Sequence, residues 1–256
     1  MLTSLRCSIC DGECNPLDVV DFNKSCEEPR GKFLPLSGDP VYYYLCEGCG
    51  FCFAPKLYKW KLKEFSKKIY NEQYIEVDPD YKAVRPEANA NNLIATFRGR
   101  ETNINHLDYG GGNALLSGLL KNSGWKSSSY DPFVDRDINL GSLGKFNLIT
   151  AFEVFEHVPD VNALVSQLNL LLDDEGIVLF STLLSDGNIE KNRRLDWWYA
   201  SPRNGHISLF SKRSLGLLAE KYEFNAGSFS AGYHVFFRKQ VPVWAEHLFG
   251  SGKQDK

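Results

Sequence analysis

No cysteine follows residue 52 in this sequence of 256 residues, so all seven cysteines lie near the N-terminus. This uneven distribution predicts two units of different chemistry. The length is sufficient for two domains of modest size, since a domain has about 150 residues. Because seven is an odd number, a scheme in which every cysteine pairs within the chain as a disulfide is excluded.

Long apolar runs and a strong excess of charge are also lacking. No stretch of 18 or more apolar residues occurs, which excludes a membrane-spanning helix, and the N-terminal sequence has no signal-peptide pattern. We therefore expect a cytoplasmic location, where clustered cysteines bind metal more often than they form disulfides. A net charge of −3 gives no global attraction to nucleic acid. Hydrophobic residues at 43% exclude whole-chain disorder.

The cysteines include two Cys-x-x-Cys pairs, Cys7 with Cys10 and Cys46 with Cys49. Four thiolates in this spacing suit tetrahedral zinc, and four protein ligands leave no open position for catalysis. We therefore expect a structural zinc site, with a set of reduced thiols lacking metal as the alternative. The short apolar runs 41–45 and 51–53 flank the second pair and predict a hairpin around it.

The chain alternates between strand and helix patterns from residue 103 onward. Two helices are expected before residue 103, one from an apolar stripe over 57–70 and another that begins near Pro86. Alternation of this kind implies a mostly parallel sheet that is covered on both faces. The expected strands are Ile104–Tyr109, Ser127–Tyr130, Phe146–Phe152, Gly176–Thr182, Glu223–Phe229 and Tyr233–Arg238.

A glycine-rich loop, Leu107–Ala114, lies between an expected strand and an expected helix. Loops in this position bind nucleotide-like ligands in open α/β sheets, since glycine lets the backbone approach the ligand closely. A dinucleotide fingerprint would need glycine where Leu115 stands. The bulky leucine conflicts with close packing of helix on strand, which disfavours an NAD-dependent oxidoreductase.

Three motifs resemble those of the class I S-adenosylmethionine (SAM) methyltransferases. Gly110-x-Gly112-x-Ala114, with Asp108 before it, resembles motif I, and Asp131 stands 23 positions later at the end of the next strand. The segment 146–159 resembles motif IV, and 170–180 resembles the motif that follows it. The resemblance covers about residues 86–240.

This resemblance implies the fold and the cofactor. We expect a Rossmann-like, mostly parallel sheet of seven strands, preceded by a small zinc-ribbon-like module. The expected domains are a zinc-binding module (1–56), a helical linker or lid (57–100) and the methyltransferase domain (101–256). The residues expected to bind SAM are Asp108, Gly110, Gly111, Gly112, Asn113, Asp131, Pro132, Phe133, Phe152 and Glu153. The chain departs from the family at 132–145, which is short for the usual helix and strand.

The candidate catalytic residues are Glu153, Glu156, His157 and His206. The first three form Glu-x-x-Glu-His after motif IV, and His206 follows in a separate loop. This set is similar to the divalent-metal site of ubiquinone-pathway O-methyltransferases and of small-RNA 3′-terminal 2′-O-methyltransferases. Three roles stay open: a second divalent metal site, a histidine general base, or a purely positioning role.

Two aromatic groups are candidates for the walls of the site. Trp197, Trp198 and Tyr199 come after the expected strand Gly176–Thr182, where this fold usually builds its acceptor pocket, although aromatic residues are as often part of a core. Tyr70, Tyr74, Tyr81 and Arg85 precede motif I, where the family often has a lid.

We favour a small-molecule methyltransferase that acts on oxygen or carbon, with a sugar-like or secondary-metabolite-like acceptor. The cysteine module resembles the zinc-binding N-terminal region of bacterial sugar C-methyltransferases. A second possibility is an RNA methyltransferase or RNA-binding protein that uses the lysine-rich segment Lys56–Lys68. A third possibility is a SAM-binding scaffold without catalytic activity.

Overall fold

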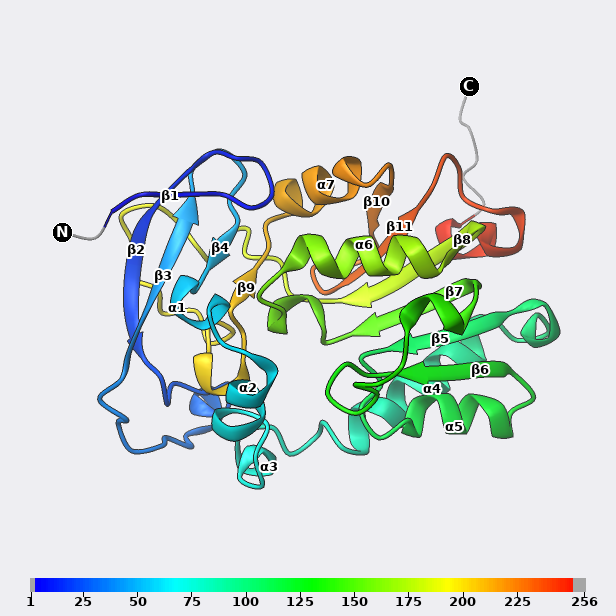
Figure 1. The fold of residues 1–256 in the computed structure, drawn as a ribbon, viewed down its shortest axis with the longest axis horizontal. Coiled ribbons are helices and arrows are strands. Elements are labelled where there is room, and N and C mark those ends of the chain that lie inside the picture. The colour runs from blue at the N-terminus through cyan, green and yellow to red at the C-terminus, as the bar shows by residue number, and fades with distance from the viewer. Residues whose placement is uncertain (1–2, 251–256) are drawn as a thin grey trace.

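The larger sheet of the computed structural model, which describes residues 3–250, has six strands in the order β10-β11-β8-β7-β5-β6 (Figure 1). The four strands β6, β5, β7 and β8 are parallel, and β11 and β10 are antiparallel additions at one edge. This confirms the expected α/β methyltransferase fold. The strands are β5 (Asn105–Tyr109), β6 (Lys126–Tyr130), β7 (Phe146–Phe152), β8 (Leu172–Ser181), β10 (Asn225–Ser228) and β11 (Tyr233–Phe237).

The expected seventh strand is missing from this sheet. Between β6 and β7 the chain forms a loop with one short 3-10 helix, η3 (Leu140–Leu143), in place of a helix and a strand. The stretch 132–145 is too short to cross the sheet twice, because a parallel crossover needs a dozen or more residues before the strand itself. The sheet therefore ends at β6.

Helices cover both faces of the sheet. α4 (Val84–Thr96) and α5 (Leu115–Asn122) bury Leu93, Phe97 and Leu120 against one face. α6 (Val161–Leu171) and α7 (Lys212–Lys221) bury leucine-rich stripes against the other. Both faces are therefore withdrawn from water, as parallel sheets require.

A second sheet of five antiparallel strands, in the order β1-β2-β3-β4-β9, carries the cysteines (Figure 1). Its last strand comes from the distant C-terminal half, where Leu209 pairs with Cys52. The expected hairpin is confirmed by the pairing of β3 with β4. The strands are β1 (Leu5–Arg6), β2 (Glu13–Asp21), β3 (Pro40–Cys46), β4 (Cys52–Phe53) and β9 (Ser208–Leu209).

The expected helix over 57–70 is wrong in one respect, because the structure breaks it in two. Lys61 has an extended backbone, with φ −85° and ψ 161°, and the Glu64 side chain caps the new helix start. The pieces are α1 (Pro55–Tyr58) and α2 (Leu62–Lys68), followed by α3 (Tyr74–Val77). The remaining 3-10 helices are η1 (Glu28–Arg30), η2 (Glu101–Asn103), η4 (Phe155–His157), η5 (Pro202–Asn204) and η6 (Val243–Phe249).

Within residues 3–250, no helix has the length and apolar character needed to cross a membrane.

Candidate functional site

The glycine loop joins β5 to α5 at the carboxyl edge of the parallel strands. Gly110 and Gly112 have left-handed backbones, with φ of +77° and +52°. A side chain at Gly111 would place its Cβ 2.3 Å from Ser129 Oγ and 2.5 Å from Asp108 Oδ2. The loop therefore needs glycine at these positions for backbone conformation and for close approach.

Asp108 lies buried beneath this loop. Its Oδ1 accepts a hydrogen bond of 2.9 Å from the Thr150 hydroxyl on β7. Burial, together with the charge of Asp131, raises the pKa of Asp108 to about 7, although the Thr150 hydrogen bond acts in the opposite direction. A carboxylate in this position is available for a cationic ligand when it is ionised.

Asp131 connects the end of β6 to the glycine loop. Its Oδ2 accepts the N–H of Gly112 at 3.0 Å, and its Oδ1 accepts the N–H of Phe133 at 2.7 Å. Each carboxylate oxygen can accept a further hydrogen bond, so the two acceptors fit the two ribose hydroxyls of SAM. Phe133 packs edge-on against Tyr70 at 5.2 Å, next to Pro132.

The expected lid reaches the glycine loop from the other side. The Asn113 side-chain amide donates to the carbonyl of Lys82 at 3.5 Å, in the segment that leads into α4. Tyr70 and Tyr74 pack at 5.2 Å, and Tyr74 and Tyr81 at 5.0 Å. These aromatic contacts hold the segment between α2 and α4 beside the loop.

Glu153 is the first residue after β7 and has a left-handed backbone, with φ of 54°. Its N–H donates to Ser181 Oγ at 2.8 Å, and the Ser181 hydroxyl donates back to Glu153 Oε1 at 2.7 Å. This reciprocal pair holds an uncommon conformation for a glutamate. The preceding Phe152 stacks on Tyr233 at 5.7 Å.

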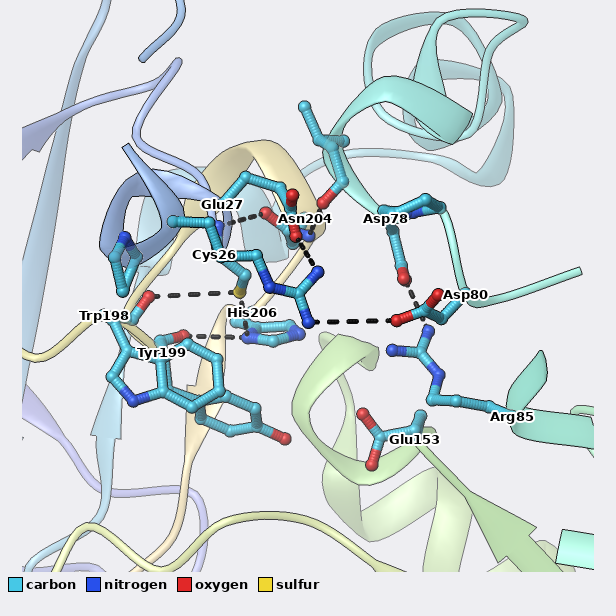
Figure 2. A pocket seen from close by; sticks show the side chains of 14 residues that line it. Cys26, Glu27, Asp78, Asp80, Arg85, Glu153, Trp198, Tyr199, Asn204 and His206 are labelled. Carbon is cyan, nitrogen blue, oxygen red and sulfur yellow. Dashed lines mark hydrogen bonds and ion pairs between the residues drawn. The ribbon is translucent and has the colours of Figure 1, made fainter. Parts of the chain in front are cut away.

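A cavity of about 300 Å³ opens beside Glu153 (Figure 2). One wall comes from the cysteine-bearing part of the chain, and the others come from the region of α3 and α4 and from the segment between β8 and β9. The residues that line it are Cys26, Glu27, Pro29, Arg30, Val77, Asp78, Pro79, Asp80, Arg85, Glu153, Trp198, Tyr199, Asn204 and His206.

Ion pairs organise the charged side of this cavity. Arg85 donates to Asp78 at 2.5 Å, and Arg30 pairs with Glu27 at 2.7 Å. Apart from Arg85, these residues are absent from the sequence expectations. They belong to no motif and come from segments without regular periodicity, so only the fold brings them together.

Tyr199 and Trp198 form the aromatic side of the cavity, whereas Trp197 is buried in the core between the N-terminal sheet and α2. Trp198 is 42% exposed. The aromatic cluster expected from the sequence is thus divided between pocket and core.

Three of the four candidate catalytic residues form a cluster of Glu156, His157 and His206, whose ligand atoms lie within 4.8 Å of one another; Glu156 and His206 are buried and His157 is half-buried. The Tyr199 hydroxyl donates to Glu156 Oε1 at 2.6 Å. Among residues 3–250, Glu156 Oε2 and His157 Nδ1 have no hydrogen-bond partner. Glu153 lies outside this cluster and faces the cavity.

Burial determines the protonation of this cluster. It raises the pKa of Glu156 to about 8 and lowers the pKa of His157 to about 3. The pKa of His206 is also lowered, by burial and by the neighbouring His157. His206 Nδ1 lies 2.8 Å from the carbonyl of Tyr199, so Nδ1 carries the proton and Nε2 is free to accept.

The four cysteines of the two pairs converge at one end of the smaller sheet. Cys7 Sγ and Cys49 Sγ are 3.7 Å apart, and Cys10 Sγ and Cys46 Sγ are 3.4 Å apart, with all four within 4.8 Å. A tetrahedron of thiolates around zinc, with Zn–S of about 2.3 Å, has sulfur atoms about 3.8 Å apart. The cluster therefore fits a zinc ion.

Residues 81–227 match the family model for a methyltransferase domain. The fold and the glycine loop define the class, that of the class I SAM-dependent methyltransferases. The match spans more than half of the chain, and the chain belongs to this methyltransferase domain family.

Several solved structures are similar to this chain. The 1,6-didemethyltoxoflavin-N1-methyltransferase of Burkholderia thailandensis is 14% identical, with a TM-score of 0.47, over 73% of this chain and 93% of that one. The magnesium protoporphyrin IX methyltransferase of Synechocystis PCC 6803 is 13% identical, with a TM-score of 0.43, over 71% and 95%. Streptomyces venezuelae DesVI is 13% identical, with a TM-score of 0.44, over 70% and 100%. No curated protein sequence matches this chain.

Proposed function

We propose that this methyltransferase transfers the methyl group of SAM to a small polar acceptor bound in the cavity beside Glu153. The position of the cavity carries the proposal. The cavity begins at Glu153, directly after β7. β7 pairs with β5, and β5 leads into the glycine loop. A volume of about 300 Å³ is at the small end of the range for small-molecule sites.

The walls of the cavity favour a ring that carries hydroxyl groups, such as a sugar or a similar secondary metabolite. Trp198 offers a flat aromatic surface on one side. Arg85 offers donors and Asp80 and Glu153 offer acceptors on the other. An acceptor with several hydroxyl groups would use both sides, and methyl transfer would take place on oxygen or on an adjacent acidic carbon.

The cofactor residues are those around the glycine loop: Asp108, Gly110 to Gly112, Asn113, Asp131, Pro132 and Phe133, with Phe152 and Glu153 beside them. Methyl transfer from a sulfonium is an in-line displacement, so orientation of the acceptor and exclusion of water supply most of the catalysis. Glu153, fixed by Ser181, orients the acceptor from the edge of the methyl-donor site.

Glu156, His157 and His206 are proposed to hold a divalent cation. Two buried polar atoms of this cluster lack partners within residues 3–250, and a cation would satisfy both. Such a cation supplies Lewis-acid activation of an acceptor hydroxyl. His206 reaches the cavity directly, and the hydrogen bond from its Nδ1 to a backbone carbonyl is typical of a metal-ligating histidine.

Formation of S-adenosylhomocysteine from SAM tests the function. We expect turnover with a panel of monosaccharides and catechols, stimulation by Mg²⁺ or Mn²⁺, and loss of at least a hundredfold of the rate in His206→Ala. Turnover that survives EDTA unchanged would contradict the cation and leave His206 as the proton acceptor. Tight S-adenosylhomocysteine binding without turnover on any acceptor would instead support a non-catalytic scaffold.

An RNA acceptor is the second candidate, because Lys59, Lys61, Lys63 and Lys67 are exposed along α1 and α2. The cavity argues against it, since Glu27, Asp78, Asp80 and Glu153 line its walls and would repel phosphates. Salt-dependent RNA binding that is lost in Lys59→Glu with Lys63→Glu would support this second candidate.

A further inference from the structure

The central strands of the larger sheet carry polar side chains on a buried face. His106 and Asp108 alternate along β5, Ser127 lies opposite His106 on β6, and Thr150 lies opposite Asp108 on β7. All four are at most 5% exposed. Buried parallel strands are normally continuous runs of apolar residues, so a polar face in the centre of the sheet calls for a functional explanation.

These side chains form one continuous chain of hydrogen bonds. Ser127 Oγ lies 2.7 Å from His106 Nδ1, and His106 Nε2 lies 2.9 Å from Thr150 Oγ1. The Thr150 hydroxyl then lies 2.9 Å from Asp108 Oδ1. This series of hydrogen bonds therefore crosses three strands and ends at the Asp108 carboxylate beneath the glycine loop.

The direction of each hydrogen bond follows from Asp108, because an ionised carboxylate has no proton to donate. Ionised Asp108 only accepts, so the Thr150 hydroxyl donates to it and Thr150 Oγ1 accepts from His106 Nε2–H. His106 Nδ1 then accepts from the Ser127 hydroxyl. Burial lowers the pKa of His106 to about 3, so the ring is neutral and carries this one proton.

We propose that His106 is a positioning residue for the cofactor, because through Thr150 it keeps the Asp108 carboxylate ionised and turned toward the glycine loop. Within residues 3–250, Asp108 Oδ2 takes part in no hydrogen bond, and it lies against Gly111. SAM carries positive charge on its sulfonium and its ammonium group, and an ionised carboxylate at this point attracts it. The proposal rests on the proposed function only in taking SAM as the ligand.

Few groups other than this series of hydrogen bonds affect the pKa of Asp108. Burial and the Asp131 charge at the end of β6 raise its pKa, whereas the Thr150 hydroxyl lowers it. His106 on β5 is neutral and acts only through its hydrogen bond to Thr150. Removing the Thr150 hydroxyl therefore leaves only the two influences that raise the pKa of Asp108.

Binding of S-adenosylhomocysteine and SAM to the full-length protein between pH 6 and pH 9 tests the proposal, by calorimetry. We expect wild-type affinity to fall below about pH 7. We expect the midpoint of this fall to move up by about one pH unit in Thr150→Val, the shift typical of one lost hydrogen bond to a carboxylate. Thr150→Ser, which keeps the hydroxyl, should behave as wild type.

The histidine itself is tested by a matched pair. His106→Leu should move the midpoint in the same direction as Thr150→Val, and His106→Gln, which keeps a donor near the position of Nε2, should restore it. Weaker binding at every pH with an unchanged midpoint in Thr150→Val and His106→Leu would show a merely structural role and overturn the proposal. A wild type that binds neither ligand at any pH would contradict the proposed function instead.

Discussion

Folding and binding make opposite demands on Asp108. Its ordinary pKa is 3.8, and burial raises it to about 7 in the folded protein. The protonated folded state is therefore favoured at low pH, and stability is lost as the pH rises from about 4 through 7. Above that range the protein holds an ionised carboxylate in its core, which is costly for folding and useful for a cationic ligand.

Asp108→Asn separates these two effects. The amide stays neutral, so we expect the variant to gain stability over wild type as the pH rises from 4 to 7, by at most about 4 kcal/mol for three pKa units. Its affinity for SAM at pH 8 should fall to that of wild type at low pH. Urea unfolding at pH 5 and pH 7.5, together with calorimetry, measures both, and a stability difference independent of pH would contradict the burial of a charge.

Gly111 offers a second test at the scale of single residues. Gly111→Ala would push a methyl group into Asp108 and Ser129, so we expect about tenfold weaker S-adenosylhomocysteine binding and a loss of about 1–3 kcal/mol of stability. Gly118→Ala is the matched control, since nothing lies within 4 Å of the added atom in α5. The control should gain about 0.5–1 kcal/mol and bind normally.

At the scale of elements, the segment between β8 and β9 is held in place by two cationic side chains, the half-buried Lys24 and the buried Arg203. Lys24 Nζ donates to the carbonyls of Trp197 and Ala200 at 2.7 and 2.8 Å. Arg203 donates to the carbonyl of Ile69 at 3.0 Å, at the end of α2. The cavity wall that carries Trp198 and His206 is thus held from the connection between β2 and β3 on one side and from the end of α2 on the other.

Lys24→Met should loosen this wall. It removes two charge-assisted hydrogen bonds, and we expect a loss of about 2–3 kcal/mol of stability. Methyl transfer should fall at least tenfold, whereas S-adenosylhomocysteine affinity should stay unchanged, because the Lys24 ammonium group donates to the segment between β8 and β9 and not to the glycine loop. Lys67→Met, at an exposed lysine of α2, serves as the control. Equal loss of ligand binding and activity in Lys24→Met would show a global defect instead.

The elements also show what the sequence could and could not predict. Six strands of the larger sheet and the glycine loop follow from apolar periodicity and glycine spacing, and the structure has them. Asp160 and Ser211 are side-chain N-caps of α6 and α7, and both are residue types that mark helix starts in a sequence. The break at Lys61 could not be predicted, because the apolar stripe of 57–70 continues on both sides of it. The cavity residues lie on irregular segments, whose positions depend on tertiary packing.

At the scale of the whole molecule, the cysteine cluster and the cavity belong to one structural unit. Cys26 and Glu27, which line the cavity, lie on the connection between β2 and β3, and the cysteine pairs lie at the opposite ends of these two strands. Zinc at the four cysteines would therefore stabilise a wall of the acceptor site while leaving the glycine loop untouched.

Removal of zinc tests whether the metal supports the acceptor site and not the glycine loop. Cys46→Ser should increase hydrogen exchange in β2 and β3 and abolish methyl transfer, while S-adenosylhomocysteine affinity changes less than about threefold. Elemental analysis should find one zinc per chain in wild type and in the control Cys26→Ser, and none in Cys46→Ser. An unchanged metal content in Cys46→Ser would contradict a site made of these four thiolates.

The pairing of β4 with β9 also has a consequence for synthesis of the protein. The apolar edge formed by Phe51, Cys52 and Phe53 leaves the ribosome early, but its partner Ser208–Leu209 emerges only after residues 54–207. Until then the edge is open to pairing with another nascent chain. Slow translation at low temperature should therefore prolong this vulnerable interval, and chaperones that shield strand edges should raise the soluble yield.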